Sequence, residues 1–175
     1  VDVLGNFFNI DSTKRPNIIF VQVEGLGRAF SGPNAYLGSF TPFLDELKGR
    51  SLYFENFLAA QGRTFASLPS ILGSLPFFTK GYNELGANMP KAFTTLSLLK
   101  NNGYHSSFIM STDASFDNEN LFIKGQGVDQ LISKTNFSEF PASHNSYWGY
   151  PDLDLMKKAV GFYAKLPNNK PFVSY

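Results

Sequence analysis

"NIIFVQV", residues 17–23, decides the fold class. The run is almost continuously apolar, contains β-branched residues and follows Pro16. Strands of a parallel sheet are covered on both faces and show unbroken apolar runs of this kind. The stretch therefore predicts a strand that is buried on both of its faces.

The elements predicted around this run alternate between helix and strand. Thr41 and Pro42 open a helix over 41–50, as an N-cap followed by proline at the first helical position. Gly103 closes a helix over 91–103 at its C-terminal cap. The remaining predicted elements are a strand over 51–59, a helix over 65–75 that contains Pro69, a strand over 104–111, a helix over 151–166 that begins at Pro151, and a strand in 170–175. This alternation predicts an α/β fold, with a mostly parallel central sheet flanked by helices.

The composition excludes several classes of function. The chain has 175 residues, enough for one domain with a core, and its net charge of +1 gives no reason to expect a nucleic-acid partner. It contains no cysteine, which excludes disulfides, thiolate metal sites and thiol nucleophiles. Neither His105 nor His144 has a second histidine at metal-ligand spacing. No apolar stretch approaches the length of a membrane span.

Glu24 directly follows the first predicted strand. Ligands of parallel sheets gather beyond the carboxyl ends of the strands, and a carboxylate there is a hard oxygen ligand on a rigid support. Gly25 and Gly27 allow close backbone approach, and they are equally typical of an ordinary turn. From spacing alone, a helix cap or a surface charge is the more common role of such an acid.

Thr64 follows Arg63 at the start of the predicted helix over 65–75. Threonine is a good N-cap, and capping is its commonest role at such a position. A helix N-terminus also presents free N–H groups and a positive dipole end, which suit a phosphoryl or sulfuryl oxygen. A metal-activated hydroxyl there is able to attack phosphorus, and Arg63 is able to pair with phosphate oxygens.

Several segments together resemble one enzyme superfamily. "RPNIIFVQVEGLG" (15–27) is similar to the opening strand of sulfatase-type domains in the alkaline phosphatase superfamily, where a Pro-Asn pair precedes a strand ending in a metal-binding acid. "SFTPFLDELKGRSLYFENFLAAQGRTFASLPSILGSLP" (39–76) resembles the family's next helix, its aromatic strand and the Gly-Arg/Lys-Thr of its nucleophile helix. The resemblance extends from Pro16 to Tyr175 and is greatest to the lipoteichoic acid synthase and phosphoglycerol transferase branch, which has Glu as the acid and Thr as the nucleophile.

The resemblance implies roles for particular residues. Glu24 would be a ligand of one divalent ion, Mn²⁺ or Mg²⁺, and Thr64 would be both ligand and nucleophile. A phospho-threonine intermediate would carry a phosphoglycerol or phosphoethanolamine group from a lipid to an acceptor. Trp148, in "YWGYPD" (147–152), matches a tryptophan of the head-group pocket, and His144 would be a further substrate-binding residue beside Arg63. Tyr150 stands where that branch leads us to expect a basic residue.

The nucleophile separates the branches of the superfamily. Sulfatases that use formylglycine form it from cysteine or serine, whereas threonine carries a methyl group on its β-carbon and cannot be converted. With Thr64 at this position, phosphoryl-group transfer is the better interpretation of the reaction.

The resemblance also implies a domain organisation. Residues 1–15 would be a linker from a preceding membrane region, and residues 16–175 would be the N-terminal portion of a catalytic domain whose sheet is incomplete at the C-terminus. The remaining metal ligands, an Asp-His pair and a further histidine, would lie beyond residue 175. Two oxygen ligands bind a divalent ion weakly, so the chain by itself is predicted to be inactive.

The expected partners are a phospholipid head group and an envelope glycan acceptor, with the membrane reached through a region outside this chain. The expected location is the extracytoplasmic face of a bacterial cytoplasmic membrane. Two alternatives remain open: a hydrolase of phospho- or sulfo-esters, and a non-catalytic module that binds anions or glycans on the same fold.

Overall fold

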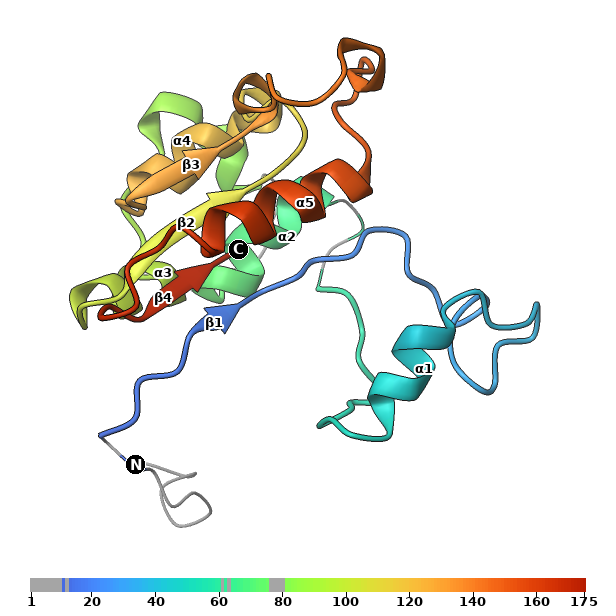
Figure 1. Cartoon of the computed structure of the whole chain (residues 1–175). Helices are drawn as coiled ribbons and strands as arrows, with labels where there is room; N and C mark the ends of the chain where they lie inside the picture. The colour runs from blue at the N-terminus through green and yellow to red at the C-terminus, as the bar shows by residue number, and fades with distance from the viewer. Residues whose placement is uncertain (1–10, 12, 61, 63, 76–80) are drawn as a thin grey trace.

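A parallel sheet forms the centre of the chain (Figure 1). The computed structural model describes residues 11, 13–60, 62, 64–75 and 81–175. The strands are β1 (Ile18–Ile19), β2 (His105–Ile109), β3 (Gln130–Ile132) and β4 (Phe172–Ser174), in the order β1-β4-β2-β3. All three strand pairs are parallel, so the predicted mostly parallel sheet is confirmed.

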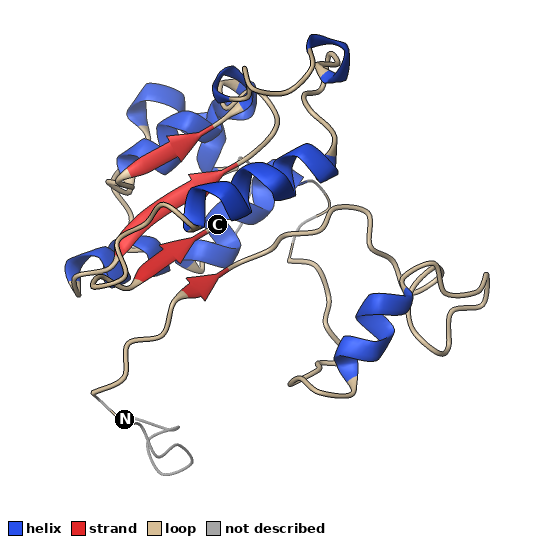
Figure 2. Ribbon diagram, viewed as in Figure 1, coloured by secondary structure: helices blue, strands red, loops and turns tan. Residues whose placement is uncertain are grey.

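Helices cover both faces of this sheet (Figure 2). α2 (Thr64–Gly73), α3 (Thr95–Asn101) and α4 (Glu119–Gly125) lie on one face, and α5 (Asp152–Tyr163) lies on the other. α1 (Pro42–Lys48) lies apart from the sheet. Short 3₁₀ turns complete the described chain: η1 (Tyr82–Asn88), η2 (Phe116–Asn118), η3 (Lys134–Asn136) and η4 (Ala142–His144).

The alternation of side chains along β2 divides the core into two clusters. Phe108 points into the cluster beneath α2, α3 and α4, while its neighbour Ile109 points into the cluster beneath α5. The members of the first cluster are Leu68, Leu72, Leu96, Tyr104, Phe108, Phe122, Ile123 and Val173. The second contains Ile109, Ile132 and Phe137, against which α5 packs. A strand with apolar residues on both faces therefore requires helices on both sides.

Two predicted helix ends agree with the structure, but the helix predicted over 91–103 starts later, at Thr95. α1 has Thr41 as its N-cap residue and Pro42 in its first turn, although the Thr41 hydroxyl is bonded to Ser31 rather than to the helix. α3 is followed by Gly103 at φ 87°, a left-handed conformation that glycine adopts without strain. The sequence analysis did not predict α4 or β3.

Two expectations about strands were wrong. The run 17–23 forms only the two-residue strand β1 at the edge of the sheet, and Ile19, Val21 and Val23 are 49%, 61% and 54% exposed. Residues 51–59 form no strand, since Leu52 and Phe54 have no neighbouring strand and are exposed. Apolar and β-branched residues favour a strand, but a strand also needs a bonded neighbour and covering side chains, and no described element supplies them here.

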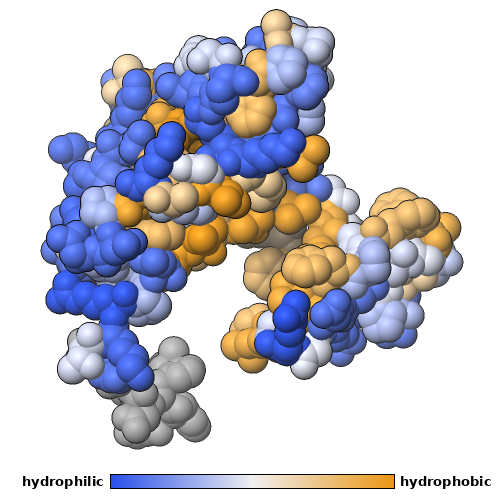
Figure 3. All heavy atoms as spheres, in the orientation of Figure 1, coloured by the Kyte–Doolittle hydropathy of each residue, from blue (hydrophilic) through white to orange (hydrophobic). Residues whose placement is uncertain are grey.

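Residues 26–60, which we call the α1 segment, stand away from the sheet (Figure 1). α1 has no buried residue, and large apolar side chains of the segment are exposed: Tyr36, Phe40, Phe43, Leu52, Phe54, Phe57 and Leu58. Figure 3 shows apolar surface on this part of the molecule, including the side that faces the rest of the chain. The segment is held internally, for example by Arg28, whose Nη1 donates to the Glu55 carbonyl oxygen at 3.1 Å.

Asp129 joins the start of β2 to the turn before β3. Its Oδ2 accepts hydrogen bonds from the Ser106 backbone N–H at 2.9 Å and the Ser106 hydroxyl at 3.0 Å, and its Oδ1 lies 2.6 Å from Lys100 Nζ. Burial acts to raise the pKa of Asp129, but the bonds from Lys100 and Ser106 outweigh it and lower the pKa to about 2. The charged form of Asp129 is therefore favoured by folding.

Replacing Asp129 by Asn is expected to lower the free energy of unfolding by about 1 kcal/mol at pH 7, because the pair with Lys100 is partly exposed and screened. The stabilisation by the charged form is fully present above the ordinary aspartate pKa of 3.8 and is lost as pH falls through about 2. Urea unfolding of both proteins at pH 2 and at pH 7 measures this difference in the free energy of unfolding. An equal difference between Asp129→Asn and wild type at pH 2 and pH 7 would contradict this account.

Candidate functional site

A cavity of about 1270 Å³ lies at the carboxyl ends of the four strands. Residues 20–24 follow β1, residues 110–113 follow β2, Lys134 follows β3 and Tyr175 follows β4, and all of them line the cavity. Leu68 of α2 and five residues of α5 between Asp152 and Val160 also belong to its lining. This is the edge at which parallel sheets bind ligands, so the cavity is the first candidate for the functional site.

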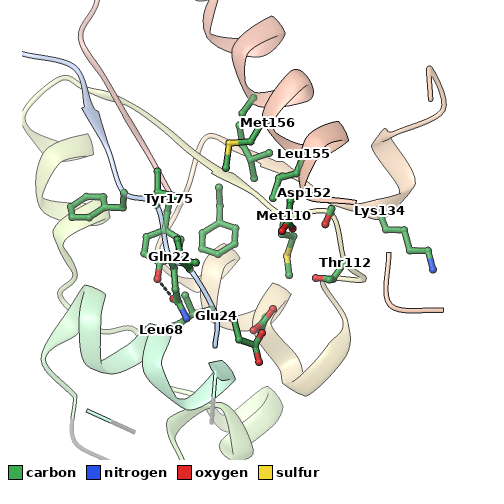
Figure 4. Close-up of a pocket in the computed structure, with 18 of the residues that line it drawn as sticks. Gln22, Glu24, Leu68, Met110, Thr112, Lys134, Asp152, Leu155, Met156 and Tyr175 are labelled. Atoms are coloured by element: carbon green, nitrogen blue, oxygen red, sulfur yellow. Dashed lines mark hydrogen bonds between the residues drawn. The ribbon is translucent and has the colours of Figure 1, made fainter. Parts of the chain in front are cut away.

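Glu24 lies in this cavity, as the sequence predicts (Figure 4). The chain that leads to it is fixed by Gln22, whose Nε2 donates to the Ser67 hydroxyl at 3.0 Å and whose Oε1 accepts a hydrogen bond from the Tyr175 hydroxyl. Ser67 belongs to the first turn of α2, the helix that begins at Thr64. The Gln22 bridge therefore holds the strand end and the helix start side by side.

Tyr175 is itself held by aromatic contacts. Its ring stacks on Phe108 at a centroid distance of 5.0 Å and on Phe20 at 6.0 Å. Burial, with a smaller contribution from the charge of Glu119, raises the pKa of Tyr175 above its ordinary value. The hydroxyl therefore keeps its proton at neutral pH and remains the donor in the bond to Gln22.

Glu119, the first residue of α4, lines the cavity with only 8% of its surface exposed. Burial raises its pKa to about 7, and the negative charges of Asp117 and Glu24 add to this shift. The carboxyl groups of Glu24 and Glu119 thus both belong to the lining of the cavity.

Trp148 lines the cavity and is not a core residue, with 66% of its surface exposed. Its ring meets Phe116 edge to face at a centroid distance of 6.1 Å and meets Tyr147 in the same manner at 5.4 Å. The loop that carries it is docked on Ser111, in the segment that follows β2, since the Tyr150 N–H donates to the Ser111 carbonyl oxygen at 3.2 Å. Trp148 is therefore an accessible aromatic surface beside the cavity.

Three other predicted site residues are placed differently. His144 does not belong to the cavity lining, and its Nδ1 lies 2.6 Å from Oδ2 of Asp154, a carboxylate that is 3% exposed. Arg63 lies outside the described residues. Thr64 is described as the first residue of α2, but its side chain lies outside what the structure describes. The roles predicted for these three residues stay predictions.

The carboxylates that line the cavity are of the ligand type that suits a hard divalent cation. Carboxylate oxygens are the ligands that Mg²⁺ and Mn²⁺ prefer. In the described parts of the chain, no three His, Cys, Asp or Glu side chains come together as a metal-binding group. The described carboxylates therefore form no complete metal site by themselves, and the ligand role of Glu24 stays a prediction.

Sequence reasoning did not assign a role to Gln22 or Glu119. Gln22 had a recognisable signal, since it is the one amide within an otherwise apolar run. Glu119 had none, because an acid in the first turn of a helix is ordinary and its burial depends on the segments around it.

Comparison with known proteins identifies a family. The family model described as sulfatase matches residues 16–175. Phosphoglycerol transferase I from Salmonella typhi is 24% identical over 151 residues, which is 82% of this chain and 20% of that protein, and the same values hold for the protein from Salmonella newport. The chain therefore spans about a fifth of the length of these curated relatives.

Two solved structures share the fold. A protein of the alkaline phosphatase superfamily from Vibrio parahaemolyticus has a TM-score of 0.78 and 30% identity, covering 92% of this chain and 39% of that one. The lipoteichoic acid synthase LtaP from Listeria monocytogenes has a TM-score of 0.79 and 23% identity, covering 91% and 39%. From the extent of the family match and this common fold, the chain belongs to the sulfatase family, within the alkaline phosphatase superfamily.

Proposed function

We propose that the protein is a metal-dependent transferase that moves a phosphoglycerol or phosphoethanolamine group from a lipid to an envelope glycan or polymer. The group would be carried on Thr64 as a phospho-threonine. Membership of the sulfatase family and the likeness to phosphoglycerol transferase I support a transferase of this general kind. The donor lipid, the acceptor and the metal are part of the proposal.

One observation carries the proposal. The hydrogen bond from Gln22 Nε2 to the Ser67 hydroxyl, 3.0 Å long, joins the chain two residues before Glu24 to the helix turn that begins at Thr64. Gly62, just before that turn, lines the same cavity as Glu24. A strand-end carboxylate and a helix-start hydroxyl are thus carried on segments that meet at the carboxyl edge of the sheet, as a shared ion requires.

The proposed reaction has two displacements at phosphorus. The Thr64 hydroxyl oxygen attacks the lipid phosphodiester, the bond from phosphorus to the diacylglycerol oxygen breaks, and that oxygen leaves with a proton. An acceptor hydroxyl then attacks the phospho-threonine, and the Thr64 oxygen is released and regains its proton. Arg63 would pair with the non-bridging phosphate oxygens, and Trp148 would contact the head group.

A divalent ion, Mn²⁺ or Mg²⁺, would lower the pKa of the attacking hydroxyl and neutralise charge that develops on the phosphoryl oxygens. Glu24 and Thr64 are the residues of this chain proposed to hold it. Glu24 suits this role because its carboxylate lies at the cavity and the segment that carries it is fixed through Gln22.

The proposed place of action is the extracytoplasmic face of a bacterial cytoplasmic membrane, where both a phospholipid donor and a glycan acceptor are present. None of the helices in the described part of the chain is both long enough and apolar enough to pass through a bilayer. Contact with the membrane is therefore proposed to depend on sequence outside this chain.

The proposal is tested with the natural protein, Mn²⁺ and vesicles that contain phosphatidylglycerol or phosphatidylethanolamine. We expect diacylglycerol to form only with metal present, and peptide mass spectrometry to find the head-group phosphate on Thr64 when no acceptor is added. A covalent group on another residue, or equal turnover in the presence of EDTA, would contradict the proposal.

The same experiment separates the two alternatives. A hydrolase would release the phosphorylated head group into water at the same rate with and without a glycan acceptor. A binding module would retain vesicles but form no diacylglycerol. Either result would replace the transferase assignment.

A further inference from the structure

The α1 segment exposes large apolar side chains beyond the carboxyl edge of the sheet (Figure 1). Phe54, Phe57 and Leu58 are 66%, 78% and 87% exposed, and α1 itself has no buried residue. Apolar surface is visible on both sides of the gap that separates the segment from the rest of the molecule (Figure 3). Contiguous exposed apolar surface indicates a contact that the present arrangement leaves unmade.

A second apolar surface, which we call the apolar wall, lines the cavity. It consists of Val21 and Val23, which follow β1, and of Met156 and Val160 of α5. Their exposed fractions are 61%, 54%, 47% and 67%. Burial of these side chains is as favourable as burial of those on the α1 segment, so each surface offers the other an apolar contact.

The connectivity of the chain makes the α1 segment the nearest partner of the apolar wall. The segment begins two residues after Glu24 and ends two residues before Gly62, and both of these residues line the cavity. A segment joined to the cavity at both ends meets the wall at an effective concentration on the order of millimolar. A second copy of the chain or another free protein at micromolar concentration competes poorly with such a partner.

The α1 segment is held together as one unit. Arg28 joins its beginning to its end, because Nη1 donates to the Glu55 carbonyl oxygen at 3.1 Å and Nη2 lies 3.7 Å from Glu55 Oε1. The rings of Phe30 and Phe40 are in contact at a centroid distance of 6.3 Å, and the Phe40 N–H donates to the Phe30 carbonyl oxygen at 2.8 Å. These contacts allow the segment to move without losing its internal structure.

Gly25 supplies a hinge between Glu24 and this unit. It has φ 69°, in the region that favours glycine, and an added Cβ would meet no atom within 4 Å. Glycine changes its backbone angles at little cost, and the open space lets the chain turn there. A rotation at this one residue moves the whole segment relative to the sheet.

We propose that the α1 segment is a lid, which turns about Gly25 and lays its apolar side chains on the apolar wall. Closure covers the cavity and excludes water from it. Transfer to an acceptor rather than to water is favoured in a closed cavity. This use of the lid rests on the proposed function, whereas the closure itself does not.

Pulsed electron paramagnetic resonance of spin-labelled protein tests the lid. Glu46→Cys in α1 and Lys157→Cys in α5 place two labels at exposed positions, and the full chain has no other cysteine. Two distances between the labels are expected, of which the shorter belongs to the closed lid. Phe57→Ser and Val160→Ser are each expected to lower the ratio of the short to the long distance at least about tenfold, because each removes an apolar side chain that closure buries.

The matched control is Leu121→Ser, which changes a 40% exposed side chain of α4, on the face of the sheet opposite α5. It is expected to leave the ratio of the two distances unchanged. All of the changed side chains are exposed, and thermal unfolding checks that each variant is folded.

Several results would overturn the lid. A single distance between the labels, or a ratio that Phe57→Ser and Val160→Ser leave unchanged, shows that the two surfaces do not meet. An equal loss of the short distance in Leu121→Ser shows that it does not depend on the apolar wall. A short distance between chains that carry one label each shows that a second copy covers the wall. Transfer from phospholipid vesicles is measured separately, so each of these results leaves the transferase proposal in place.

Discussion

A Thr64→Ala variant of the natural protein is expected to transfer head groups at least about 10³-fold more slowly than wild type, measured as kcat/KM with phospholipid vesicles. The substitution removes the oxygen that would attack phosphorus and, with it, one proposed ligand of the ion.

The size of this effect separates a nucleophile from a capping residue. If Thr64 only stabilises the start of α2, alanine lowers the free energy of unfolding by about 1 kcal/mol and leaves turnover intact. Thr64→Ser is the matched control, because it keeps the hydroxyl and loses only a methyl group. We expect the serine variant to retain measurable transfer, and an alanine variant as active as wild type would remove Thr64 from the reaction.

The sequence predicts correctly those strands that helices cover on both faces. Residues 104–111 and 170–175 become β2 and β4, since helices pack on both sides of them. The run 17–23 has the same apolar character, but most of it extends beyond the two paired residues of β1. An apolar sequence shows which side chains favour burial. It does not show which element covers them, because that depends on the tertiary structure.

In the candidate site too, some residues were predictable from the sequence and others were not. Glu24 was predictable because its place is set by sequence order alone, since the chain after a strand of a parallel sheet leads to the ligand-binding edge. Glu119 was not predictable, because its burial in the cavity lining depends on segments that are distant from it in the sequence. The aromatic surface at Trp148 similarly depends on how its loop docks beside β2.

That docking depends on Gly149, which has φ 138° and lies against the backbone after β2. A Cβ atom added at this position would lie 2.2 Å from the Ser111 carbonyl oxygen and 2.8 Å from its carbonyl carbon. Both atoms belong to the backbone, so no side-chain movement relieves the overlap. The hydrogen bond from the Tyr150 N–H to the same Ser111 oxygen would be lost if the loop moved away.

Replacing Gly149 by Ala is therefore expected to lower the free energy of unfolding by about 3 to 5 kcal/mol, from left-handed backbone strain and backbone overlap together. Urea unfolding measures it, and Trp148, the single tryptophan of the chain, reports the loop by its fluorescence. Gly161→Ala is the matched control, since Gly161 lies in α5 with no atom within 4 Å of an added Cβ. Alanine there is expected to stabilise the helix by up to about 1 kcal/mol, because it has the higher helix propensity. Equal stabilities for the two alanine variants would show that the Trp148 loop does not dock on Ser111.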